Sequence, residues 1–487
     1  MPYTTLLELS VVMAVRFVFF TRANNLQMKI KIYLLRITAA VAIVSFFTMC
    51  TKNAIVIEKN QASALAKKPT KGVLQEGVVA IGTYTVQPNE WFVDGTNMAP
   101  GTIIYVPAGT RGSLLLKNFK GTITSPIIVV NKGGRVTFSA DVTASYGFKT
   151  QNCQYFKVLG NGVAGIKYGF DVNGGNIGMT MDDLSSDFEI ANVEVRNSGF
   201  AGIMAKTDPS CDEATWRGHF IMDNVLIHDN YVHKTGGEGL YIGNSFYAEG
   251  RQLACGTVMP HDVLNLKVYN NLTDSTGCEG IQVGSATLNC EVYQNVVRSP
   301  GLSPFASGQN NGIQIGEGTG GKCYRNLVKN APGNGIIVLG LGDNVVYDNI
   351  IINTGDHGIF ADSRYTPGPH FEFINNTIIN PGAYGIRLNS ESIPMNTVIN
   401  NLFVLPIAAN AINRMDTDVK LTASNNYIAK TISEVKFKNF NADDFHLTAK
   451  SPVNNKGISV LAYGVSVDYY GRVRPTTGSV DVGATEY

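Results

Sequence analysis

Side chains that could carry out acid–base chemistry are concentrated between positions 206 and 262 of this 487-residue chain. The segment contains Lys206, Asp208, Asp212, Arg217, His219, His228, Asp229, His233, Lys234, Glu238, His261 and Asp262. Lysine and histidine can exchange a proton near neutral pH when their surroundings shift the pKa. Arginine can hold a carboxylate through two hydrogen bonds, and carboxylates are ligands that Ca²⁺ prefers. These residue types favour a site that handles an anionic ligand by proton transfer.

A repeated element must position these residues, because a glycine followed by an aliphatic residue recurs through the same part of the chain. The pairs are Gly202-Ile203, Gly239-Leu240, Gly280-Ile281, Gly312-Ile313, Gly335-Ile336, Gly358-Ile359 and Gly385-Ile386. Successive glycines are 37, 41, 32, 23, 23 and 27 residues apart, which indicates a base period near 23 with insertions. Between the pairs, short segments such as 371–374 alternate in the two-residue period of strands and lack the period of a helix.

An asparagine stands nine residues before five of these glycines. The five are Asn230, Asn271, Asn326, Asn349 and Asn376. Identical asparagines in stacked parallel coils can hydrogen-bond along the stack, and asparagine tolerates the left-handed conformation at a bend. We therefore predict that these asparagines form a structural ladder, and we exclude them from the functional site.

Stacking coil on coil would bury an aliphatic column that no single strand of this length could bury. The sequence predicts an all-β solenoid of about ten to twelve coils within residues 77–430. Open strand edges at the ends need covering. We expect residues 77–109 and 431–487 to provide these terminal caps.

Alignment on the glycines predicts a row of outward-facing side chains at the position after the aliphatic residue. The row is Met204, Tyr241, Gln282, Gln314, Ile337, Phe360 and Arg387. Tyr241 could stack on a sugar ring, and Gln282 and Gln314 could bond its hydroxyls. Glu238, just before its glycine, belongs to the same predicted substrate-binding surface. The alternative interpretation is an ordinary solvated face.

Two runs, YDNIIINTG at 347–355 and FINNTIIN at 373–380, resemble repeats of a known protein class. They are similar to the right-handed parallel β-helix repeats of the pectate-lyase-like superfamily, as found in secreted bacterial polysaccharide lyases. The resemblance covers about residues 100–430, and the tail 468–487 is similar to the closing segment of such secreted proteins. It implies a single-stranded right-handed parallel β-helix that binds a polysaccharide in a groove along one flank.

The resemblance also implies a reaction, because lyases of this kind remove the proton next to a uronate carboxylate by β-elimination. Such a reaction needs a base and a group that neutralises the carboxylate. We expect Lys206 or His228 to be the base, Arg217 to pair with the substrate carboxylate, and His233 to be a further catalytic residue. The expected ligands of a Ca²⁺ ion are Asp208, Glu238 and Glu279.

Two departures from known patterns leave other functions open. Alginate and dermatan lyases of this fold carry an acidic-x-acidic strand followed by a catalytic lysine, which the segment 237–245 lacks. The run YGFD at 168–171 is similar to the start of the mannuronan epimerase motif, but Val172-Asn173 replaces its Pro-His. The alternatives are a uronate C5-epimerase, a glycoside hydrolase with two carboxylates, and a non-catalytic glycan-binding or surface-structural protein.

The N-terminus predicts export. Basic residues precede an apolar run, 37–49, that ends at Cys50, as in a secretory signal with a loose bacterial lipobox. We expect residues 1–49 to be a signal peptide that truly starts at Met28 behind a spurious extension. Residues 50–76 would be the lipid anchor and linker. This predicts a protein held through Cys50 in outer-membrane lipid, at the cell surface or in the periplasm, or else a secreted protein.

Charge and cysteine content narrow the partners. With 39 basic and 38 acidic residues, the chain lacks the basic excess of a nucleic-acid-binding protein. We expect a monomer whose partner is an acidic polysaccharide. Cys211 and Cys255 lie in two long insertions and are the expected disulfide pair in an exported protein. The other cysteines show no zinc-binding spacing and can be buried thiols.

Overall fold

The computed structural model describes residues 82–363, 365–405 and 411–487 of the chain. The predicted signal peptide, the start at Met28, the lipidated Cys50 and the linker 50–76 lie outside these residues. No helix within the described residues is long and apolar enough to cross a membrane.

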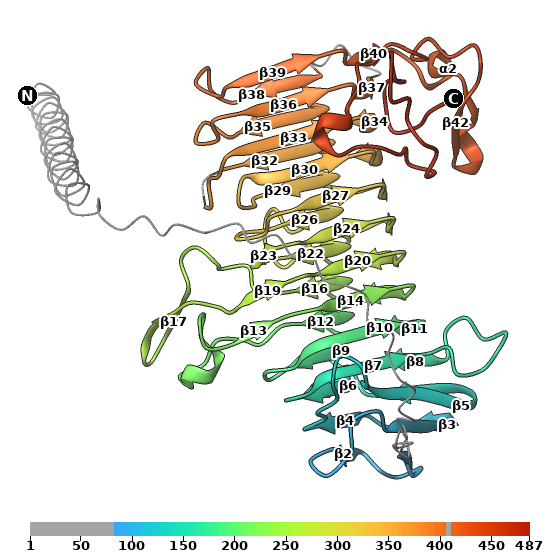
Figure 1. Ribbon diagram of the computed structural model, residues 1–487, viewed down its shortest axis with the longest axis vertical. Helices are drawn as coiled ribbons and strands as arrows, with labels where there is room; N and C mark the ends of the chain where they lie inside the picture. The colour runs from blue at the N-terminus through green and yellow to red at the C-terminus, as the bar shows by residue number, and fades with distance from the viewer. Residues whose placement is uncertain (1–81, 364, 406–410) are drawn as a thin grey trace, which may run out of the picture. The chain divides into compact units, whose positions relative to one another are not determined.

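Short parallel strands are stacked into coils, and each coil contributes one strand to a 12-stranded sheet (Figure 1). Its strands are β2 (Phe92–Asp94), β4 (Leu114–Lys117), β6 (Tyr146–Gln151), β9 (Ile177–Asp182), β12 (Ile203–Ala205), β16 (Leu240–Ile242), β22 (Ile281–Val283), β26 (Ile313–Ile315), β29 (Ile336–Val338), β32 (Ile359–Asp362), β35 (Ile386–Asn389) and β38 (Ile412–Arg414). Twelve coils agree with the predicted number.

The other two faces of the coils belong to one 23-stranded sheet. Its first face comprises β1 (Thr83–Thr85), β3 (Ile103–Arg111), β5 (Ile127–Ser139), β7 (Gln154–Leu159), β10 (Ser186–Ala191), β14 (Val225–His228), β20 (Lys267–Tyr269), β24 (Glu291–Tyr293), β27 (Lys322–Tyr324), β30 (Asp343–Tyr347), β33 (His370–Ile374), β36 (Asn396–Ile399) and β39 (Leu421–Ser424). Its second face comprises β8 (Phe170–Asn173), β11 (Val193–Arg196), β15 (Tyr231–Thr235), β21 (Leu272–Thr276), β25 (Val296–Arg298), β28 (Leu327–Lys329), β31 (Ile350–Thr354), β34 (Thr377–Pro381), β37 (Leu402–Val404) and β40 (Tyr427–Ala429). The long strand β5 pairs with β7 of the first face and with β8 of the second face. The long strand β3 pairs with β5 along both of these parts, with a shift of register between them.

Smaller elements lie outside the coils. They are a three-stranded sheet of β13 (Ile221–Met222), β19 (Asp262–Leu264) and β23 (Ala286–Leu288), the hairpin β17 (Arg251–Leu253) with β18 (Gly256–Val258), the hairpin β41 (Phe437–Asn439) with β42 (Asp444–Leu447), and the short helix α2 (Ile432–Val435). The segment 82–109, expected as an N-terminal cap, already contributes β1, β2 and most of β3 to the coils.

The core is a set of aliphatic columns inside the coils. On the 12-stranded sheet, the residue after each repeat glycine points inward, and the register pairs Ile203 with Leu240 and Leu240 with Ile281. All three are fully buried. The next side chain of each strand points outward, because successive side chains of a strand face opposite sides.

The repeat glycines fit where a side chain would not. A Cβ atom at Gly312 would lie 2.3 Å from Val328 Cγ1. The pattern also begins earlier than the sequence indicated, because Gly147 and Gly178 occupy the same position at the start of β6 and β9. They escaped notice because Phe148 and Met179 replace the aliphatic residue.

The asparagine ladder is present and is longer than predicted. It runs through Asn230, Asn271, Asn295, Asn326, Asn349, Asn376, Asn401 and Asn426, with each Nδ2 donating to the next Oδ1 at 2.9–3.0 Å. Asn295 broke the spacing of nine because an insertion, 299–311, follows it. Asn401 did so because Ala411 replaces the glycine and lies ten positions after it.

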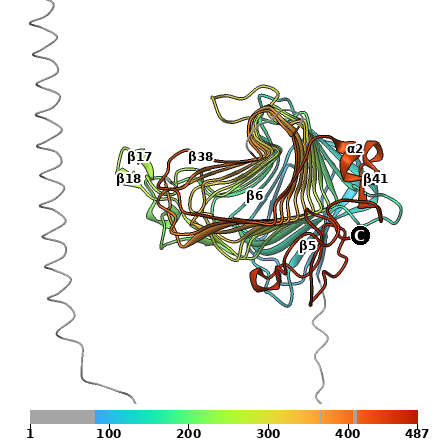
Figure 2. The same cartoon turned by 90° about the horizontal axis from the view of Figure 1, so that it is seen from above.

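The C-terminal segment, 431–487, lies against the flank of the last coils (Figure 2). It packs on buried residues of both faces of the 23-stranded sheet, such as Ile379 and Ile399. Arg474 is fully buried and forms ion pairs with Asp348 and Glu486. A buried arginine between two carboxylates fixes this tail to the coils.

Candidate functional site

The predicted outward row exists on the 12-stranded sheet. Met204, Tyr241, Gln282 and Gln314 are paired in register on β12, β16, β22 and β26. Neighbouring strands are about 4.8 Å apart, so these side chains follow one another at that spacing. Insertions cover part of the row, since the first three side chains are buried and Gln314 is half-buried.

Lys206 follows the row residue Met204 by two positions, and its side chain lies beside that of Tyr241. Its Nζ is 4.3 Å from the centroid of the Tyr241 ring and 2.9 Å from Asp208 Oδ1. The Lys206 side chain is 8% exposed, whereas that of Asp208 is 50% exposed. Burial lowers the pKa of Lys206, but Tyr241 and Asp208 outweigh it, and the pKa is raised. Lys206 is therefore a cation at neutral pH, which suits it to pair with a carboxylate and not to act as the predicted base.

Two charged residues that sequence reasoning missed extend the row toward the N-terminus. Lys149 Nζ on β6 is 3.0 Å from Asp182 Oδ1 on β9 and 3.0 Å from Asp183 Oδ2. Burial raises the pKa of Asp182 to about 6 against the opposing effect of Lys149. Lys206 continues β12 at the position in register with Asp182, because its N–H donates to Met181 O at 3.1 Å. Extending the glycine pattern to Gly178 would have revealed Asp182.

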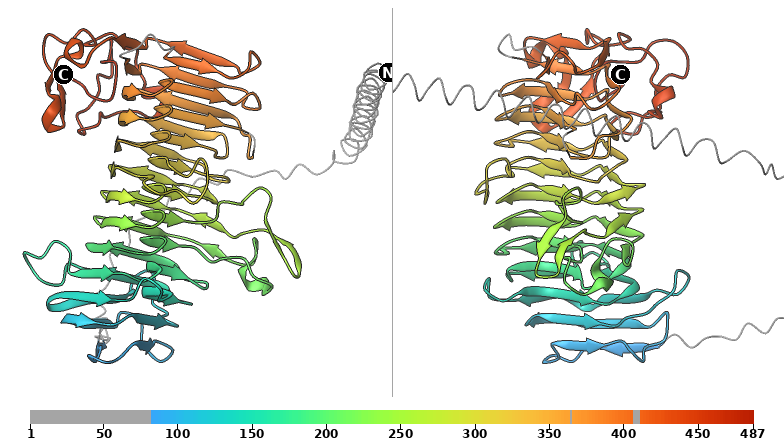
Figure 3. Two further views of the ribbon diagram at one scale, coloured as in Figure 1. Left: turned by 180° about the vertical axis from the view of Figure 1, so that it is seen from behind. Right: turned by 90° about the vertical axis from the view of Figure 1, so that its left-hand side faces the viewer.

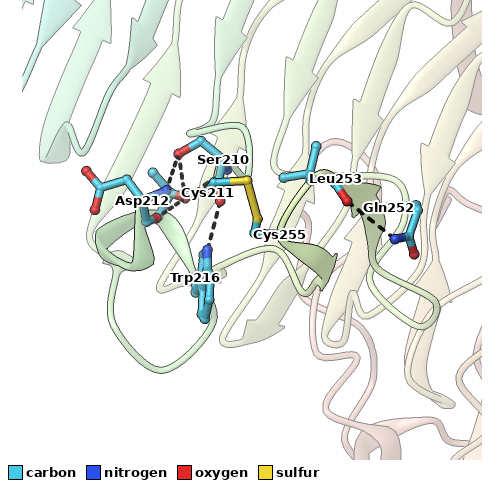
Figure 4. The surroundings of a disulfide bond; sticks show 8 residues. Ser210, Cys211, Asp212, Trp216, Gln252, Leu253 and Cys255 are labelled. Carbon is cyan, nitrogen blue, oxygen red and sulfur yellow. Dashed lines mark hydrogen bonds between the residues drawn. A yellow bond between two sulfur atoms is a disulfide. The ribbon is translucent and has the colours of Figure 1, made fainter.

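Two insertions project from the coils beside this row (green in Figure 3). The predicted disulfide joins them, with Cys211 and Cys255 44 positions apart and their Cα atoms 5.7 Å apart (Figure 4).

Arg217 holds the same insertions together. Its guanidinium lies 3.7 Å from the centroid of the Tyr247 ring, and it donates to Tyr247 O at 2.6 Å and to Pro260 O at 3.2 Å. These contacts make Arg217 an anchor of the insertions, whereas it was predicted to pair with the substrate.

His261 supports the segment that carries Lys206. Its Nε2 accepts a hydrogen bond from Thr207 N at 3.0 Å, and Nδ1 donates to Asp262 O at 2.9 Å. Burial lowers the pKa of His261 to about 4. The imidazole is thus neutral near pH 7, as its acceptor role requires.

His228 lies on a different face from Lys206, at the end of β14. Its ring begins a stack with Tyr269, Tyr293, Tyr324 and Tyr347, whose centroids are 4.5–5.0 Å apart. Burial lowers the pKa of His228, but hydrogen bonds to Glu189 and Asp229 outweigh it and the pKa is raised. The structure does not bring His228 to Lys206, so His228 is not the base of a site on the outward row.

His233 also lies away from the row, on β15 in the second face of the 23-stranded sheet. Its Nε2 is 3.0 Å from Glu194 Oε1, and its ring stacks on Tyr231 at 4.2 Å. The YGFD run reaches the same face, where Arg196 holds Asp171 through hydrogen bonds of 2.9 and 3.1 Å. The compact cluster in the sequence is therefore divided among three faces of the coil.

Glu238 and Glu279 occupy the same position in successive coils, just before the repeat glycine. Together with Cys278 they place three potential ligand atoms within 4.8 Å of one another. All three residues are buried, and Oε2 of each glutamate has no hydrogen-bond partner among the described residues. Burial raises the pKa of Glu238 and raises that of Glu279 to about 7.

This donor set does not fit the predicted Ca²⁺ ion. Calcium takes six to eight oxygen ligands, whereas the third group beside the two glutamates is a thiol. Asp208, the remaining predicted ligand, pairs with Lys206 and is not part of that group. No step of a reaction is therefore derived through calcium.

A loop, 299–311, lies over Phe200 and over the turn that carries Cys278, because Gly301 N donates to Cys278 O at 2.8 Å and Ser303 N donates to Gly277 O at 3.0 Å. Phe305 of this loop stacks on Phe200 at 5.5 Å, and Phe200 packs on Tyr241 at 6.2 Å. Phe305 is nevertheless 58% exposed. Tyr241 is thus packed against Phe200, and the exposed Phe305 lies on the other side of Phe200.

Comparisons with known proteins agree on the fold. A family model described as "Right handed beta helix region" matches residues 262–428. The chain is a right-handed parallel β-helix. No curated protein matches it.

Several solved structures are similar to the chain at low identity. Pectate lyase Pel9A is 15% identical, covering 84% of this chain and 97% of its own, with a TM-score of 0.43. The lyase Pedsa3628 of family PL6 from Pseudopedobacter saltans is 12% identical, covering 69% and 92%, with a TM-score of 0.41. The A-module of mannuronan C-5 epimerase AlgE4 from Azotobacter vinelandii is 13% identical, covering 68% and 87%, with a TM-score of 0.41.

Proposed function

We propose that this chain processes an acidic polysaccharide on the outward row of the 12-stranded sheet, by β-elimination at a uronate. The observation that carries the proposal is the Lys206 ammonium, nearly buried beside the Tyr241 ring. Among the described residues its one ion-pair partner is the exposed carboxylate of Asp208. A substrate carboxylate can take the place of the Asp208 carboxylate beside the Lys206 ammonium. The exchange costs little desolvation free energy, because Asp208 is exposed and returns to water.

In the proposed step, Lys206 pairs with the uronate carboxylate and stabilises the negative charge that develops on it. The phenolic oxygen of Tyr241 acts as the general base and takes the proton from C5 of the sugar. The electron pair left on C5 forms the C4–C5 double bond as the bond between C4 and the glycosidic oxygen breaks. The Tyr241 phenol then returns the proton to that leaving oxygen, so no water is consumed.

The test is a panel of polyuronates assayed by the ultraviolet absorbance of the unsaturated product, with added Ca²⁺ and with a chelator. We expect product from at least one polyuronate, with the chelator making no difference. Lys206→Gln and Tyr241→Phe should each lower kcat by about 10²- to 10⁴-fold. Lys322→Gln, an exposed lysine on β27, is the matched control. Absence of unsaturated product from every polyuronate, or full activity of Lys206→Gln, contradicts the proposal.

Glycan binding without turnover is a second candidate, favoured by the burial of the row's central residues. Tyr241 is 7% exposed, whereas Gln314, Phe360 and Arg387 further along the row are half-buried. A purely binding surface would use this second part. In that case Arg387→Ala should weaken polyuronate binding measured by calorimetry, Lys206→Gln should leave it unchanged, and no product should form.

We also propose that the chain is exported and anchored through Cys50. The disulfide between Cys211 and Cys255 supports an oxidising compartment. Lipid labelling of the full chain should be lost in Cys50→Ala, and a variant starting at Met28 should still be labelled. Labelling that persists in Cys50→Ala contradicts this anchor.

A further inference from the structure

The site before strands β16 and β22 has the character of a ligand cage and not of a solvated turn. Glu238, Cys278 and Glu279 come from two successive coils, and each is almost completely buried. Their ligand atoms, two carboxylate oxygens and a thiol sulfur, lie within 4.8 Å of one another.

The same position in the following coils shows what a purely structural solution would be. Asn311 and Asn334 stand there, and Asn334 Nδ2 donates to Asn311 Oδ1 at 2.9 Å. An amide ladder satisfies itself because each side chain carries both a donor and an acceptor. Ionised carboxylates carry acceptors only, so the ladder ends at Glu279, which accepts from Asn311 and has no proton to donate to Glu238.

The unsatisfied oxygens point to a missing partner. Asn311 Nδ2 donates to Glu279 Oε1 at 3.0 Å, but Oε2 of Glu279 and Oε2 of Glu238 have no hydrogen-bond partner among the described residues. Buried carboxylates without partners are unfavourable unless a proton or a cation lies between them.

We propose that Glu238, Cys278 and Glu279 bind a thiophilic divalent cation of the zinc class. Zinc accepts cysteine sulfur at about 2.3 Å and carboxylate oxygen at about 2.0–2.2 Å, commonly with three protein ligands and one open position. A thiol in the set selects such a metal over calcium. Asn311 orients Glu279 from outside the cage. This inference is independent of the proposed elimination reaction.

Binding would release the thiol proton and any carboxyl proton to solvent, because the ligands coordinate in their ionised forms. The two carboxylates and the thiolate carry three negative charges and the cation carries two positive charges, so the occupied site has a net charge of −1. Lys206 lies close enough to lower the pKa of Glu238 and can balance that charge. The ligand atoms already lie within 4.8 Å of one another, and tetrahedral coordination at the zinc–ligand lengths given above needs them about 3.6 Å apart, so a side-chain shift of at most about 1 Å is enough.

Titration with Cd²⁺ tests the site without reference to activity. The probe is the full chain in a Cys50→Ser background, stripped with a chelator, and the readout is the ultraviolet charge-transfer band of a cadmium–thiolate bond. We expect one equivalent of Cd²⁺ to produce the band and to raise the thermal midpoint. Cys278→Ser should abolish the band, and Glu279→Gln should weaken Cd²⁺ binding at least tenfold. Cys153→Ser, a buried thiol in another part of the core, should leave both unchanged.

The outcomes separate a metal site from a proton-sharing pair. Absence of the band in the parent chain, or a band of equal strength in Cys278→Ser, overturns the proposal. If Cys278→Ser does not fold, the double variant with Glu238→Gln and Glu279→Gln retains the thiol. Loss of the band in that variant supports the site, and its persistence at unchanged affinity overturns it.

Discussion

Lowering the pH should reduce the local stability of the segment that carries Lys206, because His261 is buried in its neutral form. The accepting nitrogen Nε2 receives a hydrogen bond from Thr207 N, next to Lys206. Protonation would turn that acceptor into a donor facing another donor. It would also place a charge in a fully buried position.

The size of the effect follows from the pKa of His261, which burial lowers from 6.5 to about 4. At about 1.4 kcal/mol for each pKa unit, this difference corresponds to about 3 kcal/mol. Because the folded pKa lies below the unfolded one, the unfolded segment takes up the proton first as the pH falls. The stabilisation is complete above pH 6.5 and is lost progressively toward pH 4.

The assay uses Trp216, one of the two tryptophans, which lies on the first of the joined insertions. In a Trp91→Phe background, its fluorescence reports urea unfolding of this region above pH 6.5 and near pH 4. His261→Gln keeps an acceptor for Thr207 N but does not titrate, so the variant should lose about 3 kcal/mol less stability over this range.

His228→Gln is the control of opposite sign. Its parent imidazole has a raised pKa, so its stabilisation is present at low pH and is lost as the pH rises through that pKa. Equal losses in the parent and in His261→Gln would refute the reasoning.

Three further predictions concern the framework of the site. Asn326→Ala should lower the free energy of unfolding by about 2–4 kcal/mol in urea titrations, because it leaves buried ladder groups unpaired. Asn353→Ala, in an exposed position, should lose clearly less, and equal losses would argue against the ladder's role. Gly312→Ala should be destabilised by about 1–3 kcal/mol because its Cβ meets Val328; Gly112→Ala, with open space at its Cβ, is the control, and two equally stable variants would contradict the steric argument. Cys211→Ser should remove about 4 kcal/mol from the local stability of the joined insertions and speed their proteolysis while the circular dichroism of the coils stays unchanged. An unaltered cleavage rate would show that Arg217 alone suffices to hold them.

The sequence by itself determined the architecture. The repeat glycines and the nine-residue spacing of asparagines require stacked coils, because only a solenoid brings residues of one phase into a ladder. The pairing of Cys211 with Cys255 also followed from the sequence, since both lie in insertions of neighbouring coils. The outward row from Met204 to Gln314 could be read in advance for the same reason, as each strand alternates its side chains.

Only the tertiary structure decided which side chains share a site. Positions 206–238 run across all three faces of one coil, so residues close in sequence, such as Lys206 and His228, lie on different sheets. Residues one coil apart become neighbours instead, which brings Glu238 to Cys278 and Glu279 across forty positions of sequence. Burial then raises the pKa of both glutamates, and that burial exists only once the coils and the loop 299–311 have folded. The repeat determines which position of its coil each residue occupies. The neighbouring residues of adjacent coils and the insertions above them determine the chemistry of that residue.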